Sequence, residues 1–336
     1  MAPESMEPFV TIVVVPRERI SYARESLQSL YAHTDVPFRL VWVDAGSPPR
    51  TRDYLRDQAR ARRFELVRID DYLSPNQARN VGLDRVTTRY VVFMDNDVIV
   101  APGWLGPLVR CADETGAAIV GPLNCEGPPL HEIIHFAGGE CGIRQEHGGG
   151  RIERHMVDTI DRQGQRLAEV RAQLRRQQTS VAEFHCLMAR TDIFDTIGRF
   201  DEAMLTVREN LDFCLAVAQA GATIYIEPAS VITYLGYQPL AWRDIPYYVL
   251  RWNDAWTLSS LHRFRDKWRL AEDEYFQRQY RSLQRWRRDN YLVRPLFRWI
   301  PSRRIRRVLE RLITPLERIF SRSIVTRYAR RQARLS

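Results

Sequence analysis

The stretch "YVVFMDNDVIVAPGWL", residues 90–105, places two acids directly after a run of strand-forming residues. Tyr90 to Met94 is typical of a strand that is buried on both faces. If the chain stays extended, Asp95 and Asp97 point to one side and Asn96 points away. Two close carboxylates repel each other unless a proton or a cation lies between them. The pair therefore predicts a divalent cation, magnesium or manganese, that also binds phosphate oxygens; a turn with two solvated acids is the alternative.

The segments around this stretch alternate between strand and helix patterns. Strands are predicted at 9–15, 38–44, 64–70, 90–95, 117–121 and 222–228, and helices at 18–32, 47–63 (with Ser47 as its cap), 75–86, 103–116 and 209–220. This alternation predicts an α/β fold, a mostly parallel sheet flanked by helices, with a C-terminal helical extension. Ligands of such sheets bind beyond the carboxyl ends of the strands, where Asp44, Asp70 and Asp95 lie.

Less regular patterns follow in the middle and last third of the chain. Residues 124–180 are predicted to be mainly loops, with a charged stretch at 161–178 that is either a helix or a mobile segment. Residues 240–300 are predicted to form helices rich in aromatic side chains.

The chain of 336 residues has a mildly acidic body and a strongly basic C-terminal segment. Residues 281–336 hold 17 Arg against three acids, a charge of +14, so the first 280 residues carry −5 of the total of +9. The five cysteines have no CxxC spacing, which favours reduced thiols. No signal-peptide pattern is present, and no apolar run reaches the roughly 18 residues of a membrane helix. We therefore expect a cytoplasmic protein.

Five motifs, in this order along the chain, resemble the family 2 glycosyltransferases, which have the A-type nucleotide-sugar transferase fold. The motifs are "VTIVVVP", "VWVDAGS", "SPNQARNVGL", "YVVFMDND" and "RENLDFCLAVAQAG". The resemblance covers about residues 9–235, and we expect a catalytic domain at 1–240 and a basic, amphipathic helical extension at 241–336. It implies an inverting, hexosyltransferase-type enzyme that moves a sugar from a nucleoside diphosphate sugar to a hydroxyl acceptor.

The resemblance also implies roles for residues at the predicted sheet edge. Donor nucleotide contacts are expected from Pro16, Asp44, Ser47, Arg79 and Asp95. The Asp44 carboxylate can accept a hydrogen bond from a ribose hydroxyl, and the Arg79 guanidinium can pair with a phosphate. Asp97 is expected to bind the metal directly, whereas Asp95 contacts the ribose or metal-bound water. Helix capping by Asp44 and a plain surface position for Arg79 are the alternatives.

The segment "RENLD", residues 208–212, is where the resemblance implies a catalytic base. Transfer to a hydroxyl requires a group that accepts its proton. The family commonly has two adjacent acids here, but the second position is Asn210, which cannot take a proton. Glu209 and Asp212 lie three residues apart and share a helix face; Glu209 is preferred. Acids in a first helical turn also stabilise the helix dipole without any catalytic role.

The third metal ligand of many family members, a histidine, is missing. The corresponding segment "SVITYLGYQ", residues 230–238, contains none. Tyr234, Tyr237 or His262 could face the diphosphate instead, or Asp97 and phosphate oxygens could hold the metal alone. His185, in "EFHCLMAR", is as consistent with a packed core histidine as with a residue beneath the acceptor site.

Residues 302–329 combine apolar positions at helical spacing with many arginines. The apolar positions are Ile305, Val308, Leu309, Leu312, Ile313, Leu316, Ile319, Phe320 and Ile324. A second helix is predicted to start at Pro315. Such a segment is typical of helices on an anionic membrane surface, which would suit a lipid-linked or cell-envelope saccharide acceptor at the inner face of the membrane. Packing on the catalytic domain or on a second subunit is the alternative.

Two other functions fit parts of the sequence. A polyanion-binding protein could use residues 281–336 on nucleic acid and keep a non-catalytic α/β body, but the negative charge of the first 280 residues makes nucleic acid an unlikely partner. A sugar nucleotidyltransferase would need an early Gly-rich phosphate loop, and "VVVPRERIS", residues 13–21, has no glycine. The sequence therefore favours glycosyl transfer.

Overall fold

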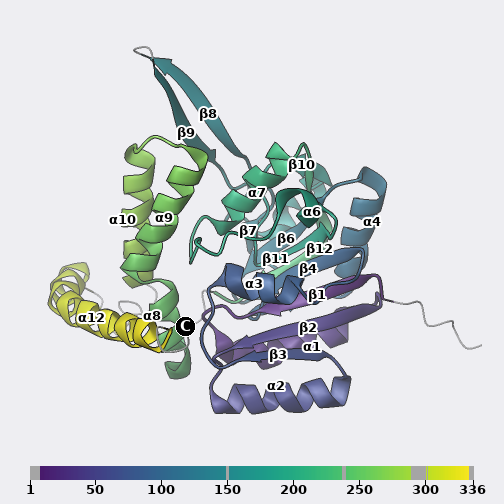
Figure 1. Ribbon diagram of the computed structural model, residues 1–336, viewed down its shortest axis with the longest axis horizontal. Coiled ribbons are helices and arrows are strands. Elements are labelled where there is room, and N and C mark those ends of the chain that lie inside the picture. The colour runs from purple at the N-terminus through teal and green to yellow at the C-terminus, as the bar shows by residue number, and fades with distance from the viewer. Residues whose placement is uncertain (1–7, 149–150, 237–239, 289–299, 301, 333–336) are drawn as a thin grey trace, which may run out of the picture.

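The computed structural model describes residues 8–148, 151–236, 240–288, 300 and 302–332. Its main strands are β1 (Val10–Val15), β2 (Phe38–Ala45), β3 (Glu65–Ile69), β4 (Tyr90–Asp95), β6 (Ile119–Glu126), β10 (Gln177–Thr179), β11 (Cys186–Arg190) and β12 (Ile224–Tyr234). They form a mixed sheet in the order β10-β12-β6-β11-β4-β1-β2-β3, with helices on both faces (Figure 1). The predicted α/β class is confirmed.

Four parallel strands bring the predicted acids to one edge of this sheet. β1 pairs in parallel with both β2 and β4, and β2 pairs in parallel with β3. The register sets Val15 beside Asp95 and Asp44 beside Arg68. Every side chain of β1 and β4 is buried, which explains their unbroken apolar runs. β11 runs antiparallel between β4 and β6, so the sheet is mixed beyond β4.

Six helices flank the sheet. They are α1 (Ala23–His33), α2 (Pro49–Arg62), α3 (Pro75–Leu83), α4 (Leu105–Thr115), α6 (Ile193–Ile197) and α7 (Glu209–Gln219). α3 lies very close to β1, because a Cβ at Gly82 would come within 2.2 Å of Val13 Cγ1. The predicted cap of α2 by Ser47 is wrong. Pro48 holds the N-cap position and Pro49 starts the helix without an N–H to be capped.

The chain turns at Asn96 and Asp97, so the predicted extended triplet is wrong. β4 pairs with β1 and β11, whereas the next strand, β5 (Val98–Val100), pairs with β12. Two hydrogen bonds hold the turn against the end of β1: Asn96 N donates to Val15 O (3.1 Å), and Arg17 N donates to Asn96 Oδ1 (2.9 Å). The acids therefore lie where the chain passes from one pair of neighbouring strands to another.

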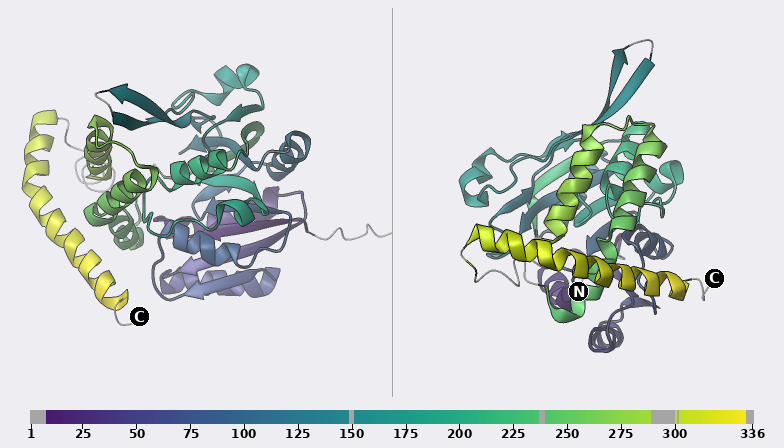
Figure 2. Two further views of the ribbon diagram at one scale, coloured as in Figure 1. Left: turned by 45° about the horizontal axis from the view of Figure 1, so that its top comes forward. Right: turned by 90° about the vertical axis from the view of Figure 1, so that its left-hand side faces the viewer.

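Residues 124–180 contain more regular structure than the sequence predicts. β7 (Ile134–Phe136) pairs with β6, and β8 (Cys141–Gly148) and β9 (Arg151–Asp158) form a hairpin that projects from the body (Figure 2). Helix α5 (Leu167–Val170) and β10 lie in the charged stretch at 161–178. The loop prediction was wrong for these segments: β7 to β9 pair with strands close in sequence, whereas β10 pairs with the distant β12. The hairpin also has a distant partner. Ala271 N, for example, donates to Arg154 O at the hairpin (2.9 Å).

The C-terminal extension consists of α8 (Ile245–Arg251), α9 (Asp254–Trp268), α10 (Glu274–Arg288) and α12 (Arg303–Gln332). Tyr248 and Phe264 belong to the same hydrophobic cluster as one face of the sheet, so α8 and α9 are packed on the body. α12 is continuous through Pro315, and the predicted second helix is wrong. Pro315 is exposed, so water can hydrate the carbonyl that the missing N–H leaves free.

Among the described residues, no helix has the length and apolar character needed to cross a bilayer.

Candidate active site

Asp95 is at the centre of a buried ionic cluster at the carboxyl end of β4. Arg17 Nη1 lies 2.5 Å from Asp95 Oδ2, and His185 Nδ1 lies 3.1 Å from the same oxygen. Burial alone would raise the pKa of Asp95, but Arg17, His185 and Arg79 outweigh it and hold that pKa well below its usual range. Burial and Arg17 lower the pKa of His185 to about 3. Asp95 is therefore a fixed anion, and His185 is neutral near pH 7.

Asp97 is the opposite case, a buried carboxyl with no hydrogen-bond partner among the described residues. Its side chain is 0% exposed, and both of its oxygens lack a partner. Burial, followed by the negative charges of Asp95 and Glu18, raises its pKa well above the ordinary value. A buried carboxylate of this kind is costly unless a proton or a cation compensates its charge. The turn that carries Asp97 is thus suited to hold a cation.

The donor set fits a hard cation that is shared with a ligand. No group of three or more His, Cys, Asp or Glu side chains that could hold a metal occurs within the described ranges. Magnesium is commonly bound through one or two carboxylates plus substrate phosphates, not by an all-protein cage. Asp97, with Asp95 nearby, matches that pattern.

Arg79 lies beneath the cluster and not on an open surface. Its side chain is 1% exposed, its Nη2 lies 3.7 Å from Asp95 Oδ1, and its guanidinium stacks on the Phe184 ring at 3.7 Å. Burial lowers the pKa of Arg79 to about 10, with Asp95 and Glu209 opposing the change. In this arrangement Arg79 positions Asp95. The next residue, Asn80, donates from its side chain to Phe200 O and accepts from Phe200 N (3.0 Å each).

A pocket of about 180 Å³ opens next to this cluster, and two carboxylates line it. Glu209 lies at the start of α7 and Glu183 just before β11, and Arg17 from the end of β1 lines the same pocket. Burial raises the pKa of Glu183, with His135 and Arg17 opposing. Asn210 Nδ2 donates to Glu183 Oε1 (3.2 Å). The pocket therefore combines two carboxylates, which can accept a proton, with the positive charge of Arg17.

Arg251 from α8 completes the pocket. Its guanidinium contacts Glu209 Oε1 and Glu18 Oε2, each at 3.2 Å, and it is 2% exposed. The ion pair fixes the direction of the Glu209 carboxylate. Sequence reasoning missed Glu18, Glu183 and Arg251. The charges in "PRER" directly after a buried strand could have pointed to Glu18, whereas only the tertiary structure brings Arg251 from a helix 42 residues beyond Glu209.

Asp212 does not line that pocket. Lys267 Nζ donates to Asp212 Oδ2 and Trp268 Nε1 donates to Asp212 Oδ1, each at 2.8 Å. Burial raises the pKa of Asp212, with Lys267 and Trp268 opposing the rise. Glu209 and Asp212 share a helix, as predicted, but their surroundings differ: one faces a pocket and the other is held by two donors from α9.

The residues predicted to contact the nucleotide base lie at the ends of β1 and β2. Asp44 is buried and pairs with Arg68 Nη1 (2.7 Å), while its other oxygen has no partner within the described chain. Ser47 and Pro16 are also buried. Tyr247 from α8 donates to Gly46 O (2.5 Å), so the extension reaches this turn as well.

The residues considered as a third metal ligand differ in their distance from the acid cluster. Tyr234 stacks on His185 (3.8 Å between ring centroids), and its ring lies under Arg17. His262 is exposed on α9 and lines a groove towards α10. Tyr237 lies outside the described residues. His135 also lies at the site, because its ring centroid is 5.2 Å from that of His185. The sequence did not predict this position.

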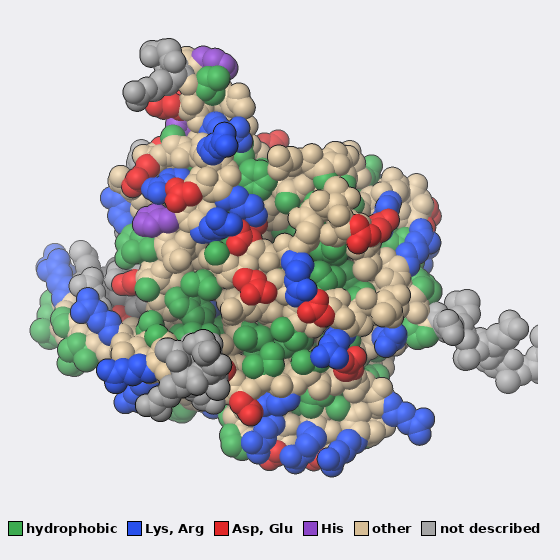
Figure 3. All heavy atoms as spheres, viewed as in Figure 1, with side chains coloured by type: hydrophobic (Ala, Val, Ile, Leu, Met, Phe, Trp, Pro, Cys, Tyr) green, Lys and Arg blue, Asp and Glu red, His purple; other side chains and the backbone are tan. Residues whose placement is uncertain are grey.

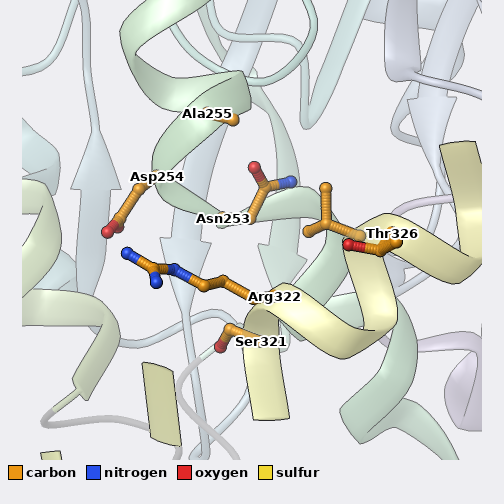
Figure 4. Close-up of a pocket in the computed structure, with 7 residues that line it drawn as sticks. Asn253, Asp254, Ala255, Ser321, Arg322 and Thr326 are labelled. Carbon is orange, nitrogen blue, oxygen red and sulfur yellow. The ribbon is translucent and has the colours of Figure 1, made fainter. Parts of the chain in front are cut away.

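A second cavity, of about 350 Å³, lies between α12 and the start of α9 (Figure 4). Asn253, Asp254 and Arg322 are among its lining residues, and none of the predicted site residues lines it. The cavity is therefore separate from the carboxyl edge of the sheet.

The fold and the acids at the carboxyl edge define a nucleotide-sugar transferase type of architecture. The family description "Glycosyl transferase family 2" matches residues 11–198. The chain belongs to this family, which confirms the resemblance.

The individual relatives share less than 30% sequence identity with this chain. "Pre-mycofactocin glycosyltransferase" of Mycobacterium tuberculosis is 27% identical over 227 residues, which are 67% of this chain and 42% of that protein. "Uncharacterized protein y4gI" of Sinorhizobium fredii is 27% identical over 222 residues, 64% of this chain and 23% of that protein. The chain thus spans less than half the length of these curated relatives. A structure of GalNAc-T7 with UDP, GalNAc and Mn²⁺ superposes with a TM-score of 0.51 at 16% identity, covering 82% of this chain and 56% of that one, which shows the shared fold.

Proposed function

We propose that the protein is an inverting glycosyltransferase that moves a hexosyl group from a nucleoside diphosphate sugar to a hydroxyl of a saccharide or lipid-linked acceptor. The observation that supports this best is the buried Asp97 carboxyl, without a partner in the described structure, at the sheet edge where Arg17 connects Asp95 to a pocket lined by Glu209 and Glu183. Membership of family 2 and the name of the mycobacterial relative support glycosyl transfer. We further propose a cytoplasmic enzyme of cell-envelope saccharide synthesis, with a catalytic part at 1–240.

In this proposal the sheet edge binds the donor. Asp97, assisted by Asp95, would hold a magnesium or manganese ion, which when bound offsets charge on the diphosphate. Arg17 lies between Asp95 and the pocket and supplies a fixed positive charge for the leaving group. Arg79 keeps Asp95 in place. Asp44 and Ser47, at the end of β2, would contact the ribose and the base, with Pro16 beside them.

Glu209 is the proposed proton acceptor. The acceptor hydroxyl gives its proton to the Glu209 carboxylate as its oxygen attacks the anomeric carbon, and the nucleoside diphosphate leaves from the opposite side. Arg251 orients Glu209 through their 3.2 Å contact. Glu183 faces the same pocket and would bind another hydroxyl of the acceptor. Asp212 is excluded from this role in the proposal because Lys267 and Trp268 occupy its oxygens.

Release of nucleoside diphosphate tests the donor part of the proposal. The purified protein is supplied with a panel of nucleoside diphosphate sugars, with manganese, with magnesium, or with EDTA. We expect release with at least one donor, its loss in EDTA, and its loss in Asp97→Asn. Asp57→Asn, at a largely exposed site on α2, is the matched control and should keep full activity. Turnover in EDTA, or an active Asp97→Asn variant, would remove the metal assignment.

Three carboxylate variants test the proton acceptor. Glu209→Gln should lose about 10²–10⁴-fold in kcat, the usual contribution of a general base. Glu183→Gln should mainly raise KM for the acceptor, and Asp212→Asn should keep kcat within about threefold of wild type. Full activity of Glu209→Gln in a folded protein would show that the proton goes elsewhere.

A further inference from the structure

Helix α12 is attached to the body by one face, near its C-terminal end. Tyr328 Oη donates to Tyr72 O (2.9 Å), and the Tyr328 ring packs edge-on against Trp256 (5.5 Å). Glu317 and Ser321 are buried on this side and bond to each other. One of the two arrangements left open by the sequence, packing on the catalytic body, is therefore present for part of this helix.

The other face of α12 is apolar and exposed. Six large side chains at spacings of one, three or four residues are between 47% and 67% exposed: Ile305, Val308, Leu312, Leu316, Ile319 and Phe320. They make up six of the ten large hydrophobic side chains that are exposed in the described part of the chain. We call these six residues the outer stripe. Figure 2 shows α12 at the outside of the molecule, and Figure 3 shows hydrophobic and basic side chains next to each other at the surface over this helix.

The exposed charges of α12 that the structure describes all have one sign. Its exposed charged residues, as far as the structure describes their side chains, are Arg304, Arg311, Arg322, Arg327 and Arg330. At 100° per residue, Arg304 and Arg311 fall on one flank of the outer stripe. Basic side chains beside a continuous apolar face are characteristic of helices that lie in the interface of an anionic bilayer.

Other occupants of this face fit less well. A second copy of the chain would bring the two sets of arginines together, and like charges across an interface are unfavourable. Nucleic acid would match the arginines but would leave the six apolar side chains in water. An anionic lipid surface satisfies both features at once, because headgroups pair with the arginines while the apolar side chains enter the acyl boundary.

We propose that α12 docks the protein on an anionic membrane surface through the outer stripe and its arginine flank. The docking rests on α12 alone. Together with the proposed function, docking indicates an acceptor that is held at a bilayer. Because α8 contributes to the candidate site and packs against α12, docking would keep the pocket attached to the lipid surface.

Sedimentation of the full chain with vesicles tests this, without donor or metal so that the result does not depend on transfer activity. Vesicles of phosphatidylcholine alone are compared with vesicles that contain phosphatidylglycerol. We expect binding to the anionic vesicles that salt weakens. Leu312→Ser with Ile319→Ser should weaken partitioning more than about tenfold. Arg304→Gln with Arg311→Gln should weaken it by about 30-fold.

Matched controls separate the outer stripe from general exposure. Ile152→Ser removes an equally exposed apolar side chain on the β8–β9 hairpin (60% exposed), and Arg50→Gln with Arg60→Gln removes two exposed charges on α2. Both should bind like wild type, and thermal melting should show that every variant is folded. Absence of vesicle binding, unchanged binding of the stripe variant, or a dimer that the stripe variant converts to a monomer would overturn the proposal. So would tight nucleic-acid binding in place of vesicle binding.

Discussion

Replacing Asp97 by Asn should make the metal-free protein more stable while it abolishes metal binding. The Asp97 carboxyl is 0% exposed, lacks a partner among the described residues, and lies near Asp95 and Glu18, whose charges oppose its ionisation. The amide has nearly the same shape but no charge. A site built to hold a cation is thus expected to cost stability when the cation is absent.

The expected gain is about 1–3 kcal/mol, because an unpaired buried group costs more when it is charged, and the substitution removes the charge while the amide stays unpaired. Unfolding entropy is roughly 2.1 cal/mol/K per residue, or about 0.7 kcal/mol/K for 336 residues. The gain therefore corresponds to a rise in Tm of about 1.5–4 °C. Free manganese at ten times its Kd should stabilise wild type by about 1.4 kcal/mol, or about 2 °C, and should leave the variant unchanged.

Differential scanning calorimetry in EDTA, between pH 4 and 8, measures the gain. Since the pKa of Asp97 is raised in the folded state, the unfolded chain releases this proton first as the pH increases. Wild type thus loses stability from about pH 4 up to the folded pKa, and the advantage of the variant should grow over that range. Asp57→Asn should track wild type throughout. The reasoning is refuted if Asp97→Asn melts at or below wild type at every pH, or if manganese shifts both proteins equally.

Three further substitutions test parts of the structure through the free energy of unfolding, measured by urea denaturation. Asp212→Asn should cost about 1–3 kcal/mol because it weakens the contact with Lys267; a neutral effect would argue against the ion pair. Gly82→Ala should cost about 1–3 kcal/mol, since the new Cβ would overlap Val13, and a stabilised variant would contradict the close packing of α3. Tyr328→Phe should cost about 0.5–1.5 kcal/mol by removing one hydrogen bond, and no change would mean that α12 is not attached there.

The strands of the first half were predictable because their signals are local. β1 and β4 are buried throughout and β2 is buried from Leu40 onward, so their sequences are mostly apolar. Asp44 and Asp95 were expected at one edge because parallel neighbours end on the same side. The turn at Asn96 was not predictable, since it depends on Val15 and on the pairing of β5 with β12.

The rest of the site depends on contacts between distant residues. Arg251 reaches Glu209 and Glu18 only after α8 has packed on the sheet. Asp212 is indistinguishable from Glu209 by sequence, and the difference comes from Lys267, 55 residues away. Pro315 predicted a break in the helix, but α12 continues through it. The exposed position of Pro315 in the folded chain makes this possible.

The bridge formed by Arg251 limits how this enzyme could be recombined with its relatives. A chimera that exchanges everything after β12 would leave Glu18 and Glu209 facing one another without the shared guanidinium. Leu283 of α10 lines the pocket as well. The junction for exchanging C-terminal modules therefore lies beyond α10, where a foreign tail could be joined without changing the residues around Glu209.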